Sequence, residues 1–331
     1  IKQEGVNYGE YYTLILFATV GMMLMAGGAD LLTIFLGIEI MSISLYVLAG
    51  FTRDKVRSNE ASLKYFLLGA FVTGFLLYGI AMLYGATGTT NLKEIAAFIA
   101  ENSGLSNPMI VAGASLLIVG FGFKIACVPF HKWSPDVYEG SPTPVTAFMS
   151  IGPKAAGFAV FLRVFLVALP DLEPKWSIVL WVLAVLTMTV GNLVAISQTN
   201  IKRMLAYSSI AHAGYALVAI IVGGEFGIAS LLFYMLAYTL MNLGAFAIII
   251  VLGKKGEENA NIDDFSGLGY KHPLLAVAMC IFMFSLAGIP PLIGFIGKFY
   301  IFSAAIKSGF IILAIIGMIN SVISVYYYLR V

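Results

Sequence analysis

The stretch GFGFKIACVPFHKW, residues 120–133, places Lys124 inside an apolar run and follows it with Pro129 and His131. The chain is 60% hydrophobic and only 11% charged, whereas a soluble domain carries roughly 25% charged residues. This composition predicts a membrane protein. A lysine at the centre of a membrane helix costs about 2.5–3.5 kcal/mol by insertion scales. Lys124 therefore needs a partner, contact with water, or a function that explains its position.

Runs of about 20 mostly apolar residues, the length that crosses a bilayer core, divide the chain into helices. We expect an all-α membrane protein with about ten such spans. The fourth and the ninth span are broken by proline and glycine, and a lysine lies beside each break, Lys124 in one and Lys298 in the other. The spans are predicted near residues 10–29, 31–51, 60–85, 109–130, 144–169, 177–197, 205–223, 226–252, 274–303 and 309–330.

The two broken spans lie five spans apart, which predicts two five-helix repeats at residues 1–173 and 174–331. Because five is an odd number, the second repeat would enter the membrane from the opposite face. Transporters with such inverted repeats place their interrupted helices near the middle of the membrane. The sequence therefore predicts two inverted repeats, each with one broken helix.

The distribution of lysine and arginine predicts the orientation of the chain, because basic residues gather in cytoplasmic loops. With ten spans, the two visible ends lie on one side of the membrane. The opposite side holds only Lys93, Lys175 and Lys307. We therefore expect both visible ends to be cytoplasmic. Their side collects Lys2, Arg53, Lys55, Arg57, Lys132, Lys202, Arg203, Lys254, Lys255, Lys271 and Arg330.

Charged side chains inside the predicted spans are the candidate functional residues. A lysine removed from water exists partly in its neutral form, so it can accept and release a proton near neutral pH. We expect five residues to take part in proton transfer, with the first two acting as an electrostatic pair. A static ion pair is the alternative for that pair. The five residues are Glu39, Lys64, Lys124, Lys154 and Lys298.

The prolines at the two breaks point to hydrated cavities beside the lysines. Proline cannot donate a backbone hydrogen bond, and the carbonyl that it frees is tolerated at membrane depth only where protein or water satisfies it. Pro129 marks the first break, and Pro290 and Pro291 mark the second. Histidine titrates near physiological pH, so His131 and His212 are candidates to link the lysines in a relay. A hydrogen bond between helices is the alternative for each histidine.

Several chemistries lack their sequence motifs. The chain has no Walker loop, no dinucleotide fingerprint after a strand, no cysteine cluster for iron–sulfur and no histidine pair suited to haem. Cys127 and Cys280 lack metal-ligand spacing, and the net charge of +2 is too small to indicate nucleic acid. We therefore expect no metal, no bound cofactor and no redox active site in this chain. The energy for transport would come from a partner or from an ion gradient.

Three longer motifs resemble a known family. They are HKWSPDVYEGSPTPVTAFMSIGPKAAGF, SQTNIKRMLAYSSIAHAGY and LAGIPPLIGFIGKFY. These motifs resemble the signatures of the antiporter-like membrane subunits of proton-pumping NADH:quinone oxidoreductase, respiratory complex I. The DVYEGSPTPVT and YSSIAHAGY forms resemble one bacterial subunit type more than its sister subunits.

The resemblance implies a fourteen-helix subunit, of which this chain would contain the fourth to the thirteenth helix. It implies a multi-pass protein of the bacterial inner membrane that contacts other membrane subunits of complex I. By motif, the family's proton-transfer residues match Glu39, Lys64, Lys124, Lys154 and Lys298. NAD, FMN, iron–sulfur clusters and quinone would lie in other subunits, and quinone reduction there would drive the translocase.

The predicted mechanism takes up protons from the cytoplasmic side near Lys124 and passes them through Lys154 and His212 to Lys298. The pair of Glu39 and Lys64 would shift the protonation of Lys124 electrostatically. A large subunit of a multisubunit cation/proton antiporter shares this helix pattern and is the main alternative. A membrane-bound hydrogenase subunit is a variant of the first interpretation. A membrane scaffold would explain the composition but not the two breaks that carry lysines.

Overall fold

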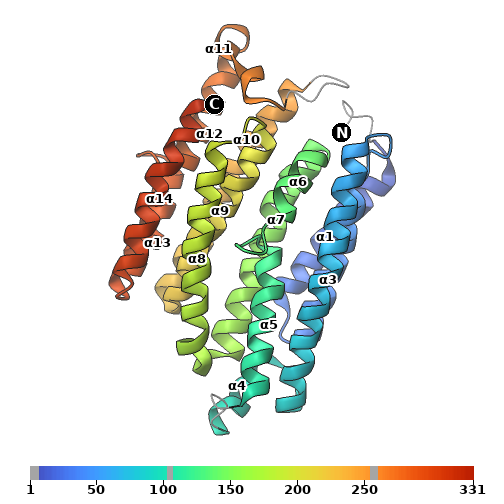
Figure 1. Cartoon of the computed structure of the whole chain (residues 1–331), viewed down its shortest axis with the longest axis vertical. Coiled ribbons are helices and arrows are strands. Elements are labelled where there is room, and N and C mark those ends of the chain that lie inside the picture. Colours follow the sequence, from blue (N-terminus) through green and yellow to red (C-terminus); the bar gives the residue numbers. More distant parts are fainter. Residues whose placement is uncertain (1–6, 103–106, 254–259) are drawn as a thin grey trace.

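The computed structural model describes residues 7–102, 107–253 and 260–331, and these residues form a bundle of helices that run side by side (Figure 1). No β-strand occurs among them, apart from two isolated bridges. The first half contains α1 (Gly9–Gly27), α2 (Leu31–Ala49), α3 (Val56–Thr87), α4 (Leu92–Glu101), α5 (Pro108–Lys124), α6 (Trp133–Gly140) and α7 (Thr143–Phe161), which continues as the π-helix η2 (Leu162–Ala168). The second half contains η3 (Pro170–Leu172), α8 (Glu173–Ile196), α9 (Ile201–Val222), α10 (Gly224–Leu252), η4 (Ile262–Phe265), α11 (Leu268–Lys271), α12 (Pro273–Ala287), α13 (Ile293–Lys307) and α14 (Ile311–Arg330).

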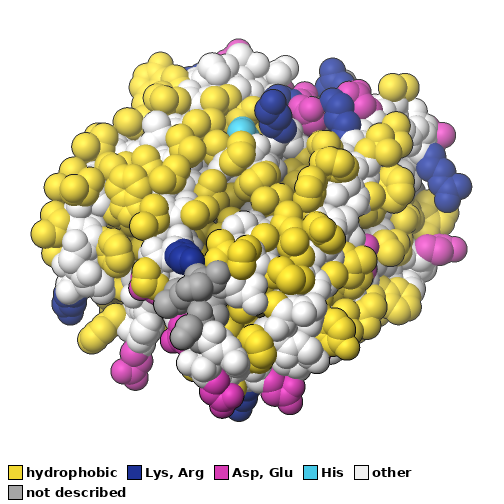
Figure 2. Space-filling model, turned by 60° about the horizontal axis from the view of Figure 1, so that its bottom comes forward, with side chains coloured by type: hydrophobic (Ala, Val, Ile, Leu, Met, Phe, Trp, Pro, Cys, Tyr) yellow, Lys and Arg dark blue, Asp and Glu magenta, His cyan; other side chains and the backbone are white. Residues whose placement is uncertain are grey.

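The outside of the bundle is apolar, as expected for a protein that spans a membrane. In the described part of the chain, 8 helical segments are long and apolar enough to cross a bilayer. Large side chains such as Leu16, Phe71, Leu232 and Val322 are exposed on their outer faces. Figure 2 shows hydrophobic side chains over most of one face, with charged side chains gathered at its edges. The chain is therefore an all-helical, multi-pass membrane protein.

The span predicted at 109–130 ends in a turn, and the span predicted at 274–303 contains parts of two shorter helices. In the first, α5 ends at Lys124, and the next helix, α6, begins at Trp133 beyond the predicted bound. In the span predicted at 274–303, α12 ends at Ala287 and α13 begins at Ile293. With 17 residues in α5 and 15 in α12, these helices measure roughly 26 and 23 Å at 1.5 Å per residue. Neither is long enough alone for a hydrocarbon core of about 30 Å.

The long loop predicted between the third and fourth spans contains a helix, α4. The side chain of Asn91 caps it by accepting hydrogen bonds from the backbone N–H groups of Lys93 and Glu94. Leu92, Ile95 and Ile99 are buried, and their spacing places them on one face of the helix. A capping asparagine followed by this spacing is a helix signal, although the helix is too short to cross a bilayer.

The two ends of the bundle carry different loops and different basic residues. Lys93 lies on α4 and Lys271 on α11, and Figure 1 shows these two helices at opposite ends. At the end with α11, Arg330 donates hydrogen bonds to the backbone carbonyls of Ile196 and Gln198. Lys2, Lys254 and Lys255, which contributed to the predicted orientation, lie outside the described residues.

Helix α9 is the most enclosed of the candidate spans. It contacts α6, α7, α8, α10, α13 and α14, so it joins the two halves of the chain. Almost all of its residues are buried, including the polar side chains of Ser208, Ser209 and His212. A helix that is surrounded by protein on all sides can carry polar groups at membrane depth because its neighbours supply their partners.

Small residues let helices approach closely in two places. A Cβ atom on Gly21 of α1 would lie 2.6 Å from the carbonyl oxygen of Gly37 and 2.6 Å from the backbone nitrogen of Met41, both on α2. A Cβ atom on Gly191 of α8 would lie 2.7 Å from the backbone nitrogen of Ala211 on α9. Membrane helices use such small residues because their association depends on close packing.

We predict that Gly21→Val lowers the stability of the chain by about 1–3 kcal/mol, because a larger residue forces a packed interface apart. The measurement is thermal unfolding of the purified chain in detergent. Gly74→Val is the control, since a Cβ atom at Gly74 would meet nothing within 4 Å. Equal melting temperatures for the two variants would show that the close contact between α1 and α2 does not require a glycine at position 21.

Candidate proton-transfer site

Lys124 is the last residue of α5, and its side chain is buried and only 4% exposed. Its Nζ donates a 2.7 Å hydrogen bond to Oγ of Ser42 on α2, and this hydroxyl donates in turn to the carbonyl of Ile38. The Nζ also lies 6.0 Å from the ring centroid of Tyr46. The ammonium group of Lys124 is therefore held by a hydroxyl group from a neighbouring helix.

Glu39 lies on α2, one turn before Ser42, and is half-buried. Its Oε1 accepts a 2.9 Å hydrogen bond from the hydroxyl of Thr73 on α3. Its negative charge acts on Lys124. Control of Lys124 by the charge of Glu39 remains a prediction.

Lys64 does not pair with Glu39, contrary to the pairing expected from the sequence. Its Nζ lies 2.7 Å from a carboxylate oxygen of Glu60 and 2.9 Å from Oδ2 of Asp136 on α6. Oδ1 of Asp136 accepts a 2.7 Å bond from Arg203 on α9, which also donates to Glu139. Together with other residues they line a surface pocket of about 220 Å³. Glu39 instead contacts Thr73, which lies further along α3 than Lys64, so the two charged groups are at different levels of the bundle.

Lys154 is on α7, and its side chain is 3% exposed. Its Nζ donates a 2.7 Å hydrogen bond to the backbone carbonyl of Ser209 on α9. The hydroxyl of Ser209 accepts a 2.8 Å bond from Tyr238 on α10. Lys154 is thus directed toward the second half of the bundle.

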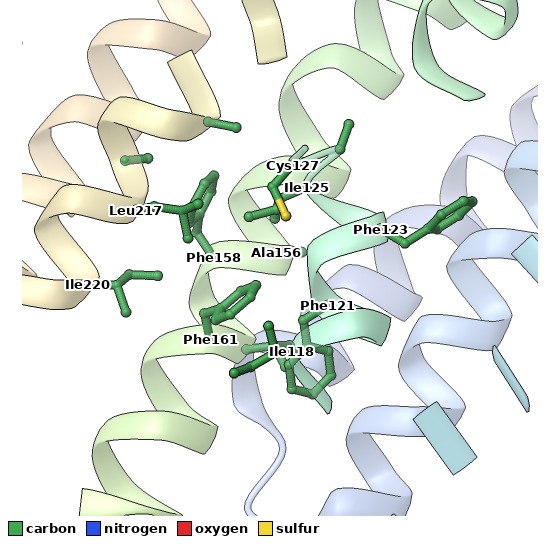
Figure 3. Packing of buried hydrophobic residues seen from close by; sticks show 14 of the residues in the cluster. Ile118, Phe121, Phe123, Ile125, Cys127, Ala156, Phe158, Phe161, Leu217 and Ile220 are labelled. Carbon is green, nitrogen blue, oxygen red and sulfur yellow. The ribbon is translucent and has the colours of Figure 1, made fainter. Parts of the chain in front are cut away.

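Lys124 and Lys154 are on neighbouring segments but turn in opposite directions, the first toward α2 and the second toward α9. Apolar side chains pack in this region, with Ile125 and Cys127 in one cluster with Phe158 and Leu217 (Figure 3). Among the described residues, no hydrogen bond links one lysine to the other. We call the cluster of Ile125, Cys127, Phe158 and Leu217 the apolar layer.

His212 lies on α9 and is 2% exposed. Its Nδ1 is 2.6 Å from the hydroxyl of Tyr234, and its Nε2 is 3.1 Å from the hydroxyl of Tyr328. The positive charges of Lys298 and Lys154 both act on this imidazole. The structure therefore brings His212 together with Lys154 and Lys298, and Lys124 belongs to a separate group with Glu39.

Lys298 is on α13, and its side chain is 4% exposed. Its Nζ donates to the carbonyls of Leu286 and Ala287, at 3.0 and 2.9 Å, and to Oγ of Ser321 at 2.9 Å. The two carbonyls belong to the last turn of α12, where backbone acceptors lack partners within the helix. The side chain rests on Gly288, whose φ of +87° and missing Cβ make room for it.

The remaining predicted residues lie in the two turns. Pro129 and His131 are in the segment between α5 and α6, and Pro290 and Pro291 are in the segment between α12 and α13. The backbone N–H of Val128 in the first turn donates to the hydroxyl of Thr187 on α8. His131 is half-buried, and its Nδ1 is buried without a hydrogen-bond partner in the structure.

Sequence reasoning missed several polar groups of the site. Lys202 was assigned to a loop, but it is 1% exposed and donates to the carbonyl of Ser141. Its position in the first turn of α9 follows from Asn200, which caps that helix. The serine and tyrosine partners of the lysines were missed because uncharged polar residues are common in membrane helices. In the described part of the chain, no group of three or more His, Cys, Asp or Glu residues could hold a metal ion.

These features define a multi-pass helical membrane protein with protonatable side chains in its interior. Residues 28–324 match the family model described as NADH:quinone oxidoreductase/Mrp antiporter, TM. The chain belongs to this family.

Known proteins similar to the chain include a subunit N of NADH-quinone oxidoreductase from Trichlorobacter lovleyi. It is 64% identical over the whole chain, which spans 68% of that protein. Among solved structures, respiratory complex I from Thermus thermophilus contains a similar chain, with a TM-score of 0.84, 41% identity, and coverage of 98% of this chain and 70% of that one. The Mrp complex from Dietzia sp. is also similar, with a TM-score of 0.87, 27% identity, and coverage of 96% and 59%. Subunit N is the type that the DVYEGSPTPVT and YSSIAHAGY motifs resemble.

We predict that Asp136→Asn lowers stability by about 1–2 kcal/mol, because it weakens charge-assisted bonds to both Lys64 and Arg203 that solvent only partly screens. Glu60→Gln is the control. It removes an exposed pair within one helix, worth about 0.5 kcal/mol or less. Thermal unfolding in detergent measures both. If the two variants unfold at the same temperature, Asp136 does not join α3 to α9.

Proposed function

We propose that the chain is a proton-translocating, antiporter-like membrane subunit of a bacterial NADH:quinone oxidoreductase and works among other membrane subunits. The observation that carries the proposal is the set of three lysines, Lys124, Lys154 and Lys298, each 3–4% exposed and each hydrogen-bonded inside the bundle. The 64% identity to a subunit N supports the same conclusion.

Buried lysines suit proton transfer because removal from water disfavours their charged form, while hydrogen-bond acceptors favour it. Because these two effects oppose each other, a small change around the lysine is enough to make it bind or release a proton. Protons are taken up from the cytoplasmic side near Lys124. They pass to Lys154, then through His212 to Lys298, from which they leave toward the opposite side.

Glu39 controls the loading of Lys124 in this mechanism. A nearby carboxylate favours the ammonium form of a lysine, so neutralising or withdrawing Glu39 favours release of the proton. Lys64 competes for the same carboxylate when it leaves Asp136, to which it is bound in the present structure. Lys64 thus links the loading of Lys124 to the ion pairs among α3, α6 and α9.

We further propose that residues 1–173 and 174–331 are two inverted five-helix repeats, with broken helices formed by α5 with α6 and by α12 with α13. Equivalent contacts recur 170 positions apart, which supports this. The bridge between Asp30 and Asn91 corresponds to the one between Asn200 and Asn261. The helix contact at Gly21 likewise corresponds to that at Gly191. In this arrangement the end of the bundle that carries Arg203, Lys271 and Arg330 faces the cytoplasm.

The energy for transport comes from redox chemistry in other subunits, which carry NAD, FMN, iron–sulfur clusters and quinone. This chain contributes side chains that hold and pass protons, and its place in the enzyme is that of a translocase.

The alternative function is the transport of another cation in exchange for protons. The structural similarity to the Mrp complex favours this alternative. The identity of 27% to that chain is well below the 64% to subunit N. Measuring proton transport with and without sodium separates the two functions. We expect the same rate in both conditions, and a requirement for sodium would favour the antiporter.

We predict that Lys124→Ala and Lys298→Ala each reduce the number of protons pumped per NADH oxidised by roughly tenfold or more, because each removes a group that transfers the proton. The assay uses membrane vesicles that contain the assembled complex and an internal pH dye. Lys93→Ala, at an exposed lysine on α4, is the control. Full pumping by an assembled Lys124→Ala complex would contradict the proposed function.

Glu39→Gln is expected to lower pumping several-fold, because an amide keeps the hydrogen bond from Thr73 but lacks the charge that acts on Lys124. Thr73→Val is the matched variant, since it removes the hydrogen bond and keeps the charge. We expect it to retain most of the pumping in the same vesicle assay. If Thr73→Val lowered pumping more than Glu39→Gln, Glu39 would act through its hydrogen bond rather than its charge.

A further inference from the structure

His212 has a tyrosine hydroxyl at each of its two ring nitrogens. Tyr234 on α10 lies 2.6 Å from Nδ1, and Tyr328 on α14 lies 3.1 Å from Nε2. All three side chains are buried, with the tyrosines no more than 1% exposed. The rings of Tyr215 and Tyr238 pack against the imidazole at centroid distances of 5.7 and 5.1 Å. Both ring nitrogens of His212 are thus hydrogen-bonded to hydroxyl groups from two other helices.

The two tyrosines extend from His212 toward the two lysines. The hydroxyl of Tyr328 also hydrogen-bonds Ser208, the residue before Ser209, whose carbonyl holds Lys154. The ring of Tyr234 packs against α13 at Gly297, where a Cβ atom would lie 2.9 Å from its Cδ2. Gly297 directly precedes Lys298. Tyr328 therefore contacts the residue before the one that holds Lys154, and Tyr234 contacts the residue before Lys298.

We propose that the hydroxyls of Tyr328 and Tyr234 carry the proton into and out of His212 and are relay residues of the transfer path. This inference rests on the proposed function and names side chains that complete it. Neither tyrosine carries a charge at neutral pH, since the phenol is a donor and acceptor with a pKa near 10 in its free form. Each hydroxyl passes a proton by accepting one and donating another.

The transfer balances in protons. Starting with the neutral imidazole protonated at Nδ1, the Tyr328 hydroxyl donates its proton to Nε2 and accepts a replacement from the side of Ser208 and Lys154. The imidazolium then donates its Nδ1 proton to the Tyr234 hydroxyl, which releases its own proton toward Lys298. One proton has moved, both phenols are restored, and His212 is left as the other neutral tautomer. The ring must return to the first tautomer before the next proton passes.

The chain offers a matched control in Tyr327, the neighbour of Tyr328. Its side chain is equally buried, but its hydroxyl donates a 2.9 Å bond to Oδ1 of Asn192 instead of contacting His212. Replacement by phenylalanine removes one buried hydroxyl at either position, together with the bonds to His212 and Ser208 at Tyr328 and the bond to Asn192 at Tyr327. A merely structural role predicts similar losses at the two positions, whereas the relay predicts different losses.

The experiment compares Tyr328→Phe, Tyr234→Phe and Tyr327→Phe in vesicles that contain the assembled complex. The readouts are protons pumped per NADH oxidised and the ratio of pumping rates in H₂O and D₂O. We expect Tyr328→Phe and Tyr234→Phe to lower the pumping ratio roughly tenfold and to raise the isotope effect, because the slowed step is a proton transfer. Tyr327→Phe is expected to keep the wild-type ratio and isotope effect.

Normal pumping by both Tyr328→Phe and Tyr234→Phe would overturn the inference, and so would an equal loss in Tyr327→Phe. If one of the two relay variants does not assemble, the other decides by the same criteria. Lys298→Ala in the same series separates this inference from the proposed function. A loss in Lys298→Ala with normal pumping by the tyrosine variants rejects only the relay, whereas normal pumping by Lys298→Ala rejects the proposed function.

Discussion

An ammonium group inside an apolar bundle has to take its hydrogen-bond acceptors from the protein, and the rest of the structure follows from this constraint. Lys298 takes them from the end of α12, where the carbonyls of Leu286 and Ala287 have no partner within the helix. Lys124 is itself the last residue of α5. The end of α12 thus supplies acceptors for Lys298, whereas the ammonium of Lys124 takes its acceptor from Ser42 on α2.

Helix α9 supplies the polar groups between the two interrupted segments. Ser208, Ser209 and His212 lie within little more than one helical turn, so their side chains reach neighbours on several sides. Lys154 from α7 and Tyr328 from α14 both meet α9 in this turn. The burial of α9 is what allows such a row of polar side chains, because every face has a protein partner.

Hydropathy and the cost of burying charge predicted the membrane class and drew attention to Lys124, Lys154 and Lys298, which the structure buries, since apolar runs and the charges within them are local properties of the chain. The partner of Lys64 was predicted incorrectly, because Asp136 lies 72 residues away in sequence and only the packing of α6 against α3 brings it near. The sequence did not single out Tyr234 and Tyr328, because a tyrosine in an apolar helix looks the same in the sequence whether or not its hydroxyl group takes part in function.

The apolar layer of Ile125, Cys127, Phe158 and Leu217 has a consequence for the proposed transfer. In the part of the chain that the structure describes, no hydrogen bond joins Lys124 to Lys154, and the side chains that pack in this region are apolar. The proposed step between the two lysines therefore requires water to enter or a side chain to move, and the packing of the layer sets how often that occurs.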